Sequence, residues 1–207
     1  FDYTRALNAC VTTARNGWYD GLDDYMKLEY VPDERTGSSV SVTLEYAYDD
    51  WCIAQMAMPD RVSAPGDTMI YGEFLKRSKN YLNVWDPSVG FMRPRTSDGT
   101  FRKNFDVLST HGQGFIEGNA WNYSLYVPHD PDALISLTGG RKRFIQHLDS
   151  LFTMELPDSY FAGTEDITRD GIIGNYVHGN EPSHHVPYLF NYAREPRRTQ
   201  YWVRHIM

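Results

Sequence analysis

The sequence predicts an all-α protein built from consecutive helical hairpins. Apolar residues recur at three- and four-residue spacing through several long segments, which is the pattern of helices with one buried face. Short turns and long polar loops rich in Gly, Pro and Asp separate these segments. The alternation of apolar and polar residues that marks a half-buried strand is scarce. Helical hairpins that follow one another along the chain favour a toroid.

The first part of the chain holds two helical patterns around an irregular connection. A helix over residues 3–15 ends at a C-terminal capping signal, and residues 17–38 are rich in Gly, Asp and Pro. A long helix over residues 39–58 has one apolar face and one polar face. We assign Asp49 and Asp50 to the solvated face, with calcium ligation as the alternative.

Further helices follow the same periodicity, separated by two long loops. Residues 86–116 are expected to form a loop with a short strand or hairpin, and residues 156–174 an irregular loop. Asp130 is a natural N-cap before Pro131, and Gly139-Gly140 ends that helix. The expected helices span residues 66–85, 118–126, 131–138, 141–154, 183–193 and 196–207.

Composition excludes several classes of partner. The chain has 207 residues, is 41% hydrophobic and carries a formal net charge of -7. An acidic chain does not bind nucleic acid or anionic membranes through bulk electrostatics, and no run of about twenty apolar residues could span a bilayer. Aromatic residues make up 14% of the chain, which suits both a large helical core and a surface that stacks on sugar rings.

Two short stretches concentrate polar side chains beyond what packing requires. Residues 174–185, GNYVHGNEPSHH, hold three histidines, two amides and a carboxylate before a helical pattern that Ser183 would cap. Residues 117–123, EGNAWNY, place a carboxylate at the start of an aromatic-rich helix, and residues 127–130, VPHD, add a His-Asp pair. Such clusters on turns beside helix starts indicate binding of anionic or hydroxyl-rich ligands.

Together with SVTLEYAYDDW at residues 41–51 and GFMRP at residues 90–94, these stretches resemble glycoside hydrolase family 92. The resemblance implies an exo-acting, calcium-dependent, inverting α-mannosidase. It also implies a six-hairpin (α/α) barrel behind an N-terminal β-sandwich. We therefore expect residues 1–207 to be a single partial catalytic domain, with the β-sandwich and the C-terminal part of the family architecture absent.

The resemblance places the general acid at Glu117. The neighbouring Phe115, Trp121 and Tyr123 would favour the protonated carboxyl by desolvation. From the residues alone, the alternative is a helix N-terminal Glu stabilised by the helix dipole. The family's base is an Asp beyond the last helix of this chain, so a missing C-terminal segment or a second chain is expected to supply it.

Calcium is the cofactor that the resemblance implies, bound in the sugar site. It takes about six to eight oxygen ligands, and Asn180 and Glu181 offer two such oxygens side by side. A hydrogen bond from Glu181 to the sugar or to His184 is the alternative. Zinc is disfavoured, because His178, His184 and His185 do not have the spacing of a helical ligand pair and no thiol is near.

The remaining site residues are assigned to substrate binding. Those expected to line the mannose pocket are Trp121, His129, Asp130, His178 and His184. Asp130 has the N-cap as its alternative role. Glu165 and Asp166, in the loop before the pocket motif, are expected to contact the leaving sugar, with a solvated connector as the alternative.

The expected substrate is a mannose-containing oligosaccharide of the N-glycan or mannan type. The resemblance implies a secreted, periplasmic or cell-surface protein. A non-catalytic carbohydrate-binding fragment and another (α/α)-toroid glycosidase are the alternative functions. Val203, Ile206 and Met207 would lie on an open edge of the ring, so we expect the remainder of the polypeptide or a second chain to complete the barrel.

Overall fold

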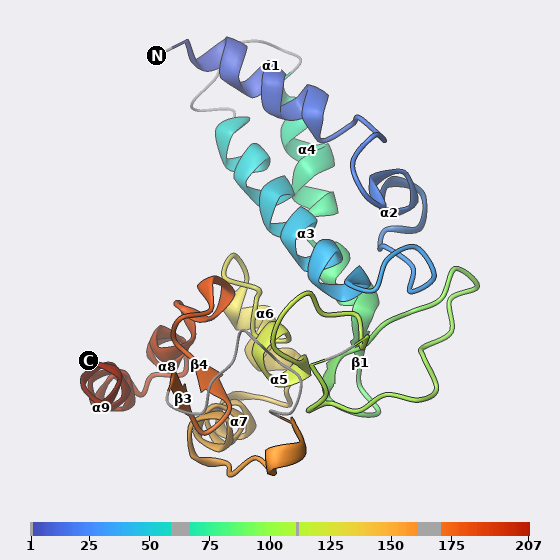
Figure 1. Ribbon diagram of the computed structural model, residues 1–207. Coiled ribbons are helices and arrows are strands. Elements are labelled where there is room, and N and C mark those ends of the chain that lie inside the picture. Colours follow the sequence, from blue (N-terminus) through green and yellow to red (C-terminus); the bar gives the residue numbers. More distant parts are fainter. Residues whose placement is uncertain (1, 59–66, 111, 161–170) are drawn as a thin grey trace. The chain divides into compact units, whose positions relative to one another are not determined.

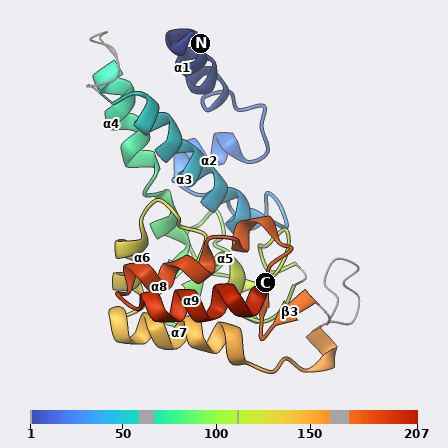
Figure 2. The same cartoon turned by 90° about the vertical axis from the view of Figure 1, so that its left-hand side faces the viewer.

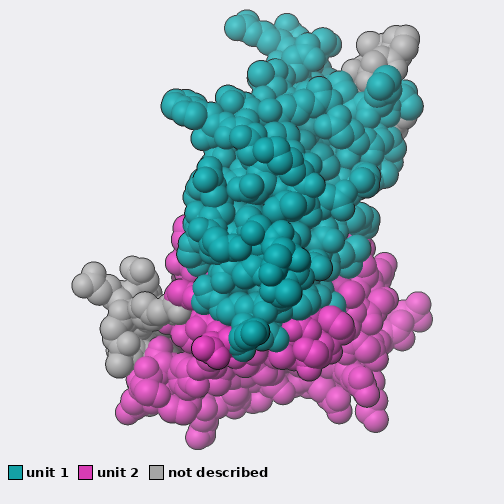
Figure 3. Space-filling view, turned by 90° about the vertical axis from the view of Figure 1, so that its right-hand side faces the viewer, with its two compact units in different colours: residues 1–85, 93–103 teal, residues 86–92, 104–207 magenta. Residues whose placement is uncertain are grey.

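The computed structural model describes residues 2–58, 67–110, 112–160 and 171–207 (Figure 1). Most of the described residues are helical, and the strands among them are two residues long. The predicted all-α class is therefore confirmed. The chain divides into two compact units, an N-terminal unit of residues 1–85 and 93–103 and a C-terminal unit of residues 86–92 and 104–207 (Figure 3). The single domain expected over residues 1–207 stays a prediction.

The N-terminal unit is built around two helices that pack along each other, α3 (Ser39–Met56) and α4 (Asp67–Arg77). The helix α1 (Tyr3–Thr13) packs on α3, and the 3₁₀-helix η1 (Asn80–Val84) follows α4. The core between these helices includes Leu7, Val11, Ile53, Ala54 and Phe74. The predicted helices over residues 3–15 and 39–58 are confirmed to within two residues at each end.

A helix that the sequence analysis missed lies inside the segment 17–38. It is α2 (Leu22–Leu28), which begins after Gly21 and ends at Glu29, both with a positive φ. A helix of seven residues is too short to show a helical period. Burial of Leu22 and Tyr25 against the unit stabilises the helix instead.

Asp50 differs from its prediction as a solvated carboxylate. Its side chain is 1% exposed, and the Arg77 guanidinium lies 2.9 Å from Oδ1. The Tyr25 hydroxyl donates to Oδ2 at 2.7 Å, and Arg77 also donates to the Ala14 carbonyl at 3.0 Å. The contacts of Asp50 and Arg77 therefore connect α2, α3, α4 and the end of α1. Desolvation nevertheless raises the pKa of Asp50 to about 6, while Asp49 on the same helix is exposed.

The C-terminal unit surrounds the ring of Phe152 near the end of α7 (Arg141–Thr153). This ring lies 4.7 Å from Tyr176, 6.2 Å from Phe190 and 4.5 Å from Trp202, measured between ring centroids. These residues belong to β4 (Tyr176–Val177), α8 (Leu189–Tyr192) and α9 (Pro196–Ile206). Figure 2 shows α7, α8 and α9 lying alongside one another. Burying each large side chain in this cluster contributes about 1.5–3 kcal/mol to folding.

The other elements of this unit are short. They are α5 (Ala120–Tyr123), α6 (Pro131–Leu137), β3 (Ile172–Ile173), and the 3₁₀-helices η2 (Asp158–Tyr160), η4 (Glu181–Ser183) and η5 (Val186–Tyr188). The strands β1 (Trp85–Asp86) and β2 (Phe91–Met92) pair with each other, which agrees with the hairpin expected within residues 86–116. No helix in the described part of the chain is both long and apolar enough to cross a membrane.

Two helix predictions in this unit are wrong in extent. The helix expected over residues 118–126 is only the four-residue α5, and the helix expected over residues 183–193 is broken into η4, η5 and α8. Pro182 and Pro187 have no N–H to donate to an α-helical ladder, so the chain forms 3₁₀ turns there. Ser183 consequently lies inside η4 and is not the N-cap of a long helix. The helices predicted over residues 131–138, 141–154 and 196–207 are confirmed.

Candidate active site

The predicted site residues that the structure describes all lie in the C-terminal unit. Glu117, Trp121, His129 and Asp130 come from one stretch of chain, and the residues 178–184 from another. Glu165 and Asp166 lie outside the described residues. The site is therefore built from two loops, and its geometry depends on what holds them together.

The second loop starts from the hairpin of β3 and β4 (Figure 1). Ile173 pairs with Tyr176, so Gly174 and Asn175 are the two central residues of the turn. Gly174 has φ +65°, and Asn175 is not in the left-handed region, which is the pattern of a II′ hairpin turn. The Asn175 N–H donates to the Leu151 carbonyl at 2.7 Å, so the turn is attached to α7.

Three buried asparagines connect this turn to the first loop. Asn119 and Asn175 exchange hydrogen bonds between their side-chain amides, each at 3.2 Å. Asn122 Nδ2 donates to the Asn175 carbonyl at 2.7 Å, and Asn122 Oδ1 accepts from the Asn119 N–H at 3.0 Å. The short helix α5 also contacts η4. The structure thus brings together the two sequence stretches that were singled out separately.

Sequence reasoning missed these asparagines as site residues. The three-residue spacing of Asn119 and Asn122 is the local pattern that could have identified them, because the two form a capping box at the start of α5. The partnership with Asn175 joins positions 56 residues apart, and no local pattern predicts it.

Glu117 lies two residues before the N-cap of α5, on a turn that Gly118 permits. Gly118 has φ +63°, and an added Cβ there would come within 2.8 Å of Asn122 Oδ1. The Glu117 side chain is exposed, which differs from the expected burial among aromatic rings. Among those rings, the Tyr123 hydroxyl donates to Glu117 Oε1 at 3.4 Å, and Phe115 stacks on Tyr123 at 6.0 Å. The Glu117 carboxyl is therefore exposed to solvent beside the stacked rings of Tyr123 and Phe115.

His178 and His184 lie close together in the second loop, with ring centroids 5.1 Å apart. The Tyr176 hydroxyl and His178 Nδ1 are hydrogen-bonded at 2.8 Å. Burial, followed by the nearby Tyr188, raises the pKa of Tyr176, so this hydroxyl keeps its proton and can donate it to Nδ1. When Nδ1 accepts this hydrogen bond, the His178 ring carries its proton on Nε2, where it is a donor.

His185 is a structural residue. Its Nε2 donates to the Leu125 carbonyl at 2.8 Å, and its ring meets Tyr126 edge to face. Desolvation lowers the pKa of His185, so the ring is neutral at pH 7.

Trp121 and Asp130 have partners within the unit. The Trp121 ring stacks on His147 at 4.4 Å and packs against Phe91 at 5.0 Å. Burial lowers the pKa of His147 to about 4, so this stack is uncharged at neutral pH. The Asp130 carboxylate accepts from the Ala133 N–H at 3.4 Å as the N-cap of α6, the alternative role weighed from the sequence. His129 is half-buried beside it.

The oxygens available for a cation are those of Asn180 and Glu181. Glu181 is exposed at the first position of η4, and Asn180 Oδ1 accepts from the Ser183 hydroxyl at 3.4 Å. Hard oxygen donors of this kind suit calcium. Within the described residues, however, no three His, Cys, Asp or Glu side chains cluster as a metal site would require. The donors present fit part of a calcium site and do not complete one.

Comparison with known proteins decides the family. The model of the glycosyl hydrolase family 92 catalytic domain matches residues 1–207. This chain belongs to glycosyl hydrolase family 92.

Solved family 92 structures resemble this chain over its whole length. One, a family 92 α-mannosidase from Bacteroides thetaiotaomicron in complex with mannoimidazole, has 44% sequence identity and a TM-score of 0.89, and the match covers 100% of this chain and 27% of that one. Another, an inverting family 92 mannosidase from the same species, has 33% identity and a TM-score of 0.82, and the match covers 100% of this chain and 29% of that one. The predicted fold of (α/α)-barrel type is thereby confirmed.

A curated relative of this family 92 chain is an uncharacterized secreted glycosidase of Arthroderma benhamiae. The two are 28% identical, over 85% of this chain and 23% of the relative. The chain therefore spans about a quarter of the length of the relatives it matches.

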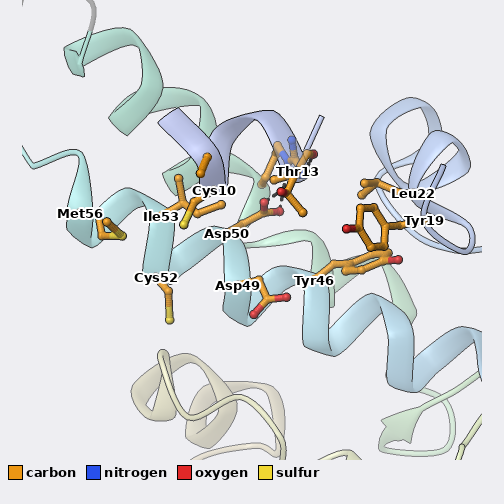
Figure 4. A pocket seen from close by; sticks show the side chains of 13 residues that line it. Cys10, Thr13, Tyr19, Leu22, Tyr46, Asp49, Asp50, Cys52, Ile53 and Met56 are labelled. Atoms are coloured by element: carbon orange, nitrogen blue, oxygen red, sulfur yellow. Dashed lines mark hydrogen bonds and ion pairs between the residues drawn. The ribbon is translucent and has the colours of Figure 1, made fainter. Parts of the chain in front are cut away.

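One cavity of this family 92 chain lies in the N-terminal unit and is lined by residues of that unit (Figure 4). Its volume is about 450 Å³, and its lining is mainly apolar, with Cys10, Ile53 and Met56 on one side and Tyr19 and Tyr46 on the other. A sugar needs many unpaired polar partners, but Asp50 in this cavity is already bonded to Arg77 and Tyr25. The motif residues of the C-terminal unit, and not this cavity, form the candidate active site.

Proposed function

We propose that this chain contributes the proton-donating side of a calcium-dependent, inverting α-mannosidase that removes terminal mannose from oligosaccharides. The observation that carries the proposal is the joining of the Glu117 loop to the His178–Glu181 loop through buried amides. The description of one solved relative as an α-mannosidase and of another as an inverting mannosidase supports both the substrate and the stereochemistry.

Glu117 would act as the general acid. An inverting glycosidase needs one protonated carboxyl to donate to the leaving oxygen and one carboxylate to activate water, about 6.5–9.5 Å apart. Glu117 is accessible to a glycosidic oxygen, and Tyr123 orients it through the bond to Oε1. The carboxylate that activates water would come from the rest of the polypeptide or from a second chain that completes the barrel.

Histidines and calcium would hold the mannose. The Nε2 proton of His178 is a donor for a sugar hydroxyl, and the adjacent His184 adds a second ring at the same edge. Trp121, His129 and Asp130 would shape the pocket beneath the sugar. Asn180 and Glu181 would contribute oxygens to the ion, which supplies a fixed positive charge that organises sugar hydroxyls.

The natural substrate would be an N-glycan or a mannan, met outside the cell or at its surface. The description of the Arthroderma benhamiae relative as secreted supports this location. A secreted or periplasmic setting also provides the calcium that the proposed site needs.

Product stereochemistry tests the proposed function. We expect the full-length protein to release β-mannose first from an α-mannoside, because a single displacement by water inverts the anomeric carbon. Proton NMR of the anomeric signals during the first turnovers would show β-mannose appearing before mutarotation forms the α-anomer. Initial release of α-mannose, or no hydrolysis of any α-mannoside, would contradict the proposal.

Removal of calcium is expected to abolish turnover, because the oxygens of Asn180 and Glu181 cannot organise neutral hydroxyls without a cation. Full-length protein treated with EDTA and dialysed should recover activity when Ca²⁺ is added. Glu181→Gln should raise the Ca²⁺ concentration needed for half-maximal recovery, because a neutral oxygen binds the ion more weakly. Glu155→Gln, at an exposed carboxylate in the same unit, is the matched control. Full turnover after dialysis would contradict the metal assignment.

A further inference from the structure

We infer that Asn119, Asn122 and Asn175 are positioning residues that fix the Glu117 loop relative to the loop that carries His178 and Glu181. The inference rests on the proposed function, since it gives these amides a role in the same reaction. None of the three would touch the substrate. They would act through the segments that they hold together.

Each side-chain oxygen and nitrogen of the three asparagines has a hydrogen-bond partner. The Asn119–Asn175 pair forms a closed ring in which each amide donates once and accepts once, both at 3.2 Å. Asn119 Nδ2 also donates to the Leu108 carbonyl at 3.2 Å, and Asn119 Oδ1 accepts from the Trp121 N–H at 3.1 Å. Asn122 closes the network by bonding the main chain of both partners. An amide is the side chain that can donate and accept in one plane, which such a ring requires.

Because the three asparagines are buried, their hydrogen bonds favour a single arrangement of the two loops. Asn119, Asn122 and Asn175 are 2%, 5% and 3% exposed. An unpaired amide at such a depth is costly, so a displaced loop would leave several donors and acceptors unsatisfied. A cavity of about 10 Å³ lies among the three side chains, which is room for about one water molecule. The two loops are consequently held in one arrangement.

The network reaches both halves of the site through short, restrained links. Asn119 is separated from Glu117 only by Gly118, whose left-handed conformation is packed against Asn122. On the other side, Asn175 leads through β4 to His178, and its N–H is fixed to α7 by the Leu151 carbonyl. A shift in the amide pair would therefore move the proposed acid relative to the proposed sugar-binding loop. Misplacement by about 1 Å can lower a rate about 100-fold.

Exchanging one amide for a carboxyl tests this role with little change in shape. In Asn175→Asp the introduced carboxylate still accepts from Asn119 Nδ2 but cannot donate to Asn119 Oδ1. We expect kcat of the full-length protein on an unactivated α-mannoside to fall about 10- to 100-fold at pH 7, with a smaller change in KM. Protonation restores an O–H donor at the same position. The ratio of variant to wild-type kcat should therefore rise as the pH is lowered.

The control and a second variant separate positioning from folding. Asn191→Asp changes an exposed amide of the same unit, and its ratio to wild type should stay near one at every pH. The pH dependence also involves the titratable groups around position 175. Among the described residues that line the amide cavity, the titratable side chain is that of Tyr160, whose hydroxyl donates to Asp106 at 3.1 Å. If Asn175→Asp fails to fold, Asn122→Asp carries the same test, because it replaces the donor to the Asn175 carbonyl. Lower thermal stability with an unchanged, pH-independent kcat would overturn the inference.

Hydrogen exchange distinguishes failure of this inference from failure of the proposed function. If the wild-type full-length protein hydrolyses no α-mannoside, the proposed function fails, and exchange alone then decides the positioning role. Faster exchange in both residues 115–119 and residues 177–183 of Asn175→Asp would support a shared restraint. Unchanged exchange in either segment would overturn it.

Discussion

Glu117→Gln in the full-length protein should lower kcat on a natural mannose disaccharide by about 100- to 10,000-fold, the usual contribution of a general acid. The amide cannot give a proton to the leaving oxygen. The amide retains an oxygen that can accept a hydrogen bond from the Tyr123 hydroxyl, which lies 3.4 Å from Glu117 Oε1 in the wild-type structure. Because the Glu117 side chain is exposed, the thermal unfolding midpoint should stay close to that of wild type.

Glu155→Gln is the matched control for this prediction, since Glu155 is an exposed carboxylate just beyond α7. It should change kcat by less than about twofold, as expected for a surface substitution away from the site. If Glu117→Gln retains kcat within a few-fold of wild type, Glu117 is not the proton donor.

Gly174→Ala should destabilise the protein by about 2–5 kcal/mol. An added Cβ would lie 2.5 Å from the Leu151 carbonyl oxygen and 2.5 Å from the Phe152 carbonyl carbon, both main-chain atoms of α7. The left-handed conformation at φ +65° costs an L-residue about 1–2 kcal/mol. Overpacking against atoms that cannot rotate away adds about 1–3 kcal/mol.

Calorimetry of the full-length protein would measure this loss as a lower unfolding midpoint. Gly179→Ala, two residues beyond β4, provides the control for the same change in size. No heavy atom lies within 4 Å of a Cβ added there, and its φ is outside the left-handed region. We expect its stability to change by less than about 1 kcal/mol. Equal midpoints for the two variants would show that the close approach of the turn to α7 does not matter.

The sequence predicted those elements whose signals are local. Asp130, Pro131 and Gly139-Gly140 define both ends of α6, and the helical period alone defines α9. The short α2 showed no period, because its stability comes from burying Leu22 and Tyr25. Pro182 and Pro187 indicate that the helix expected at residues 183–193 is interrupted, because neither has an N–H to donate. The helical spacing of the apolar residues in this segment favoured a continuous helix instead.

The candidate site was predicted as a set of residue types but not as a geometry. The density of polar groups at residues 117–123 and 174–185 identified both loops. The reciprocal pairing of Asn119 with Asn175 depends on the path of the chain between them, so no local signal predicts it. The exposure of Glu117 likewise depends on the turn at Gly118 and not on the aromatic character of its neighbours in sequence.

The central claim is that Glu117 protonates the leaving oxygen, and a leaving-group series tests it most directly. The measurement is kcat/KM of full-length wild type and Glu117→Gln on aryl α-mannosides whose phenols span a wide range of pKa. We predict a shallow dependence for wild type and a steep loss with rising leaving-group pKa for Glu117→Gln, because only poor leaving groups need full protonation. Two parallel lines, with every aryl mannoside slowed by the same factor, would contradict the assignment.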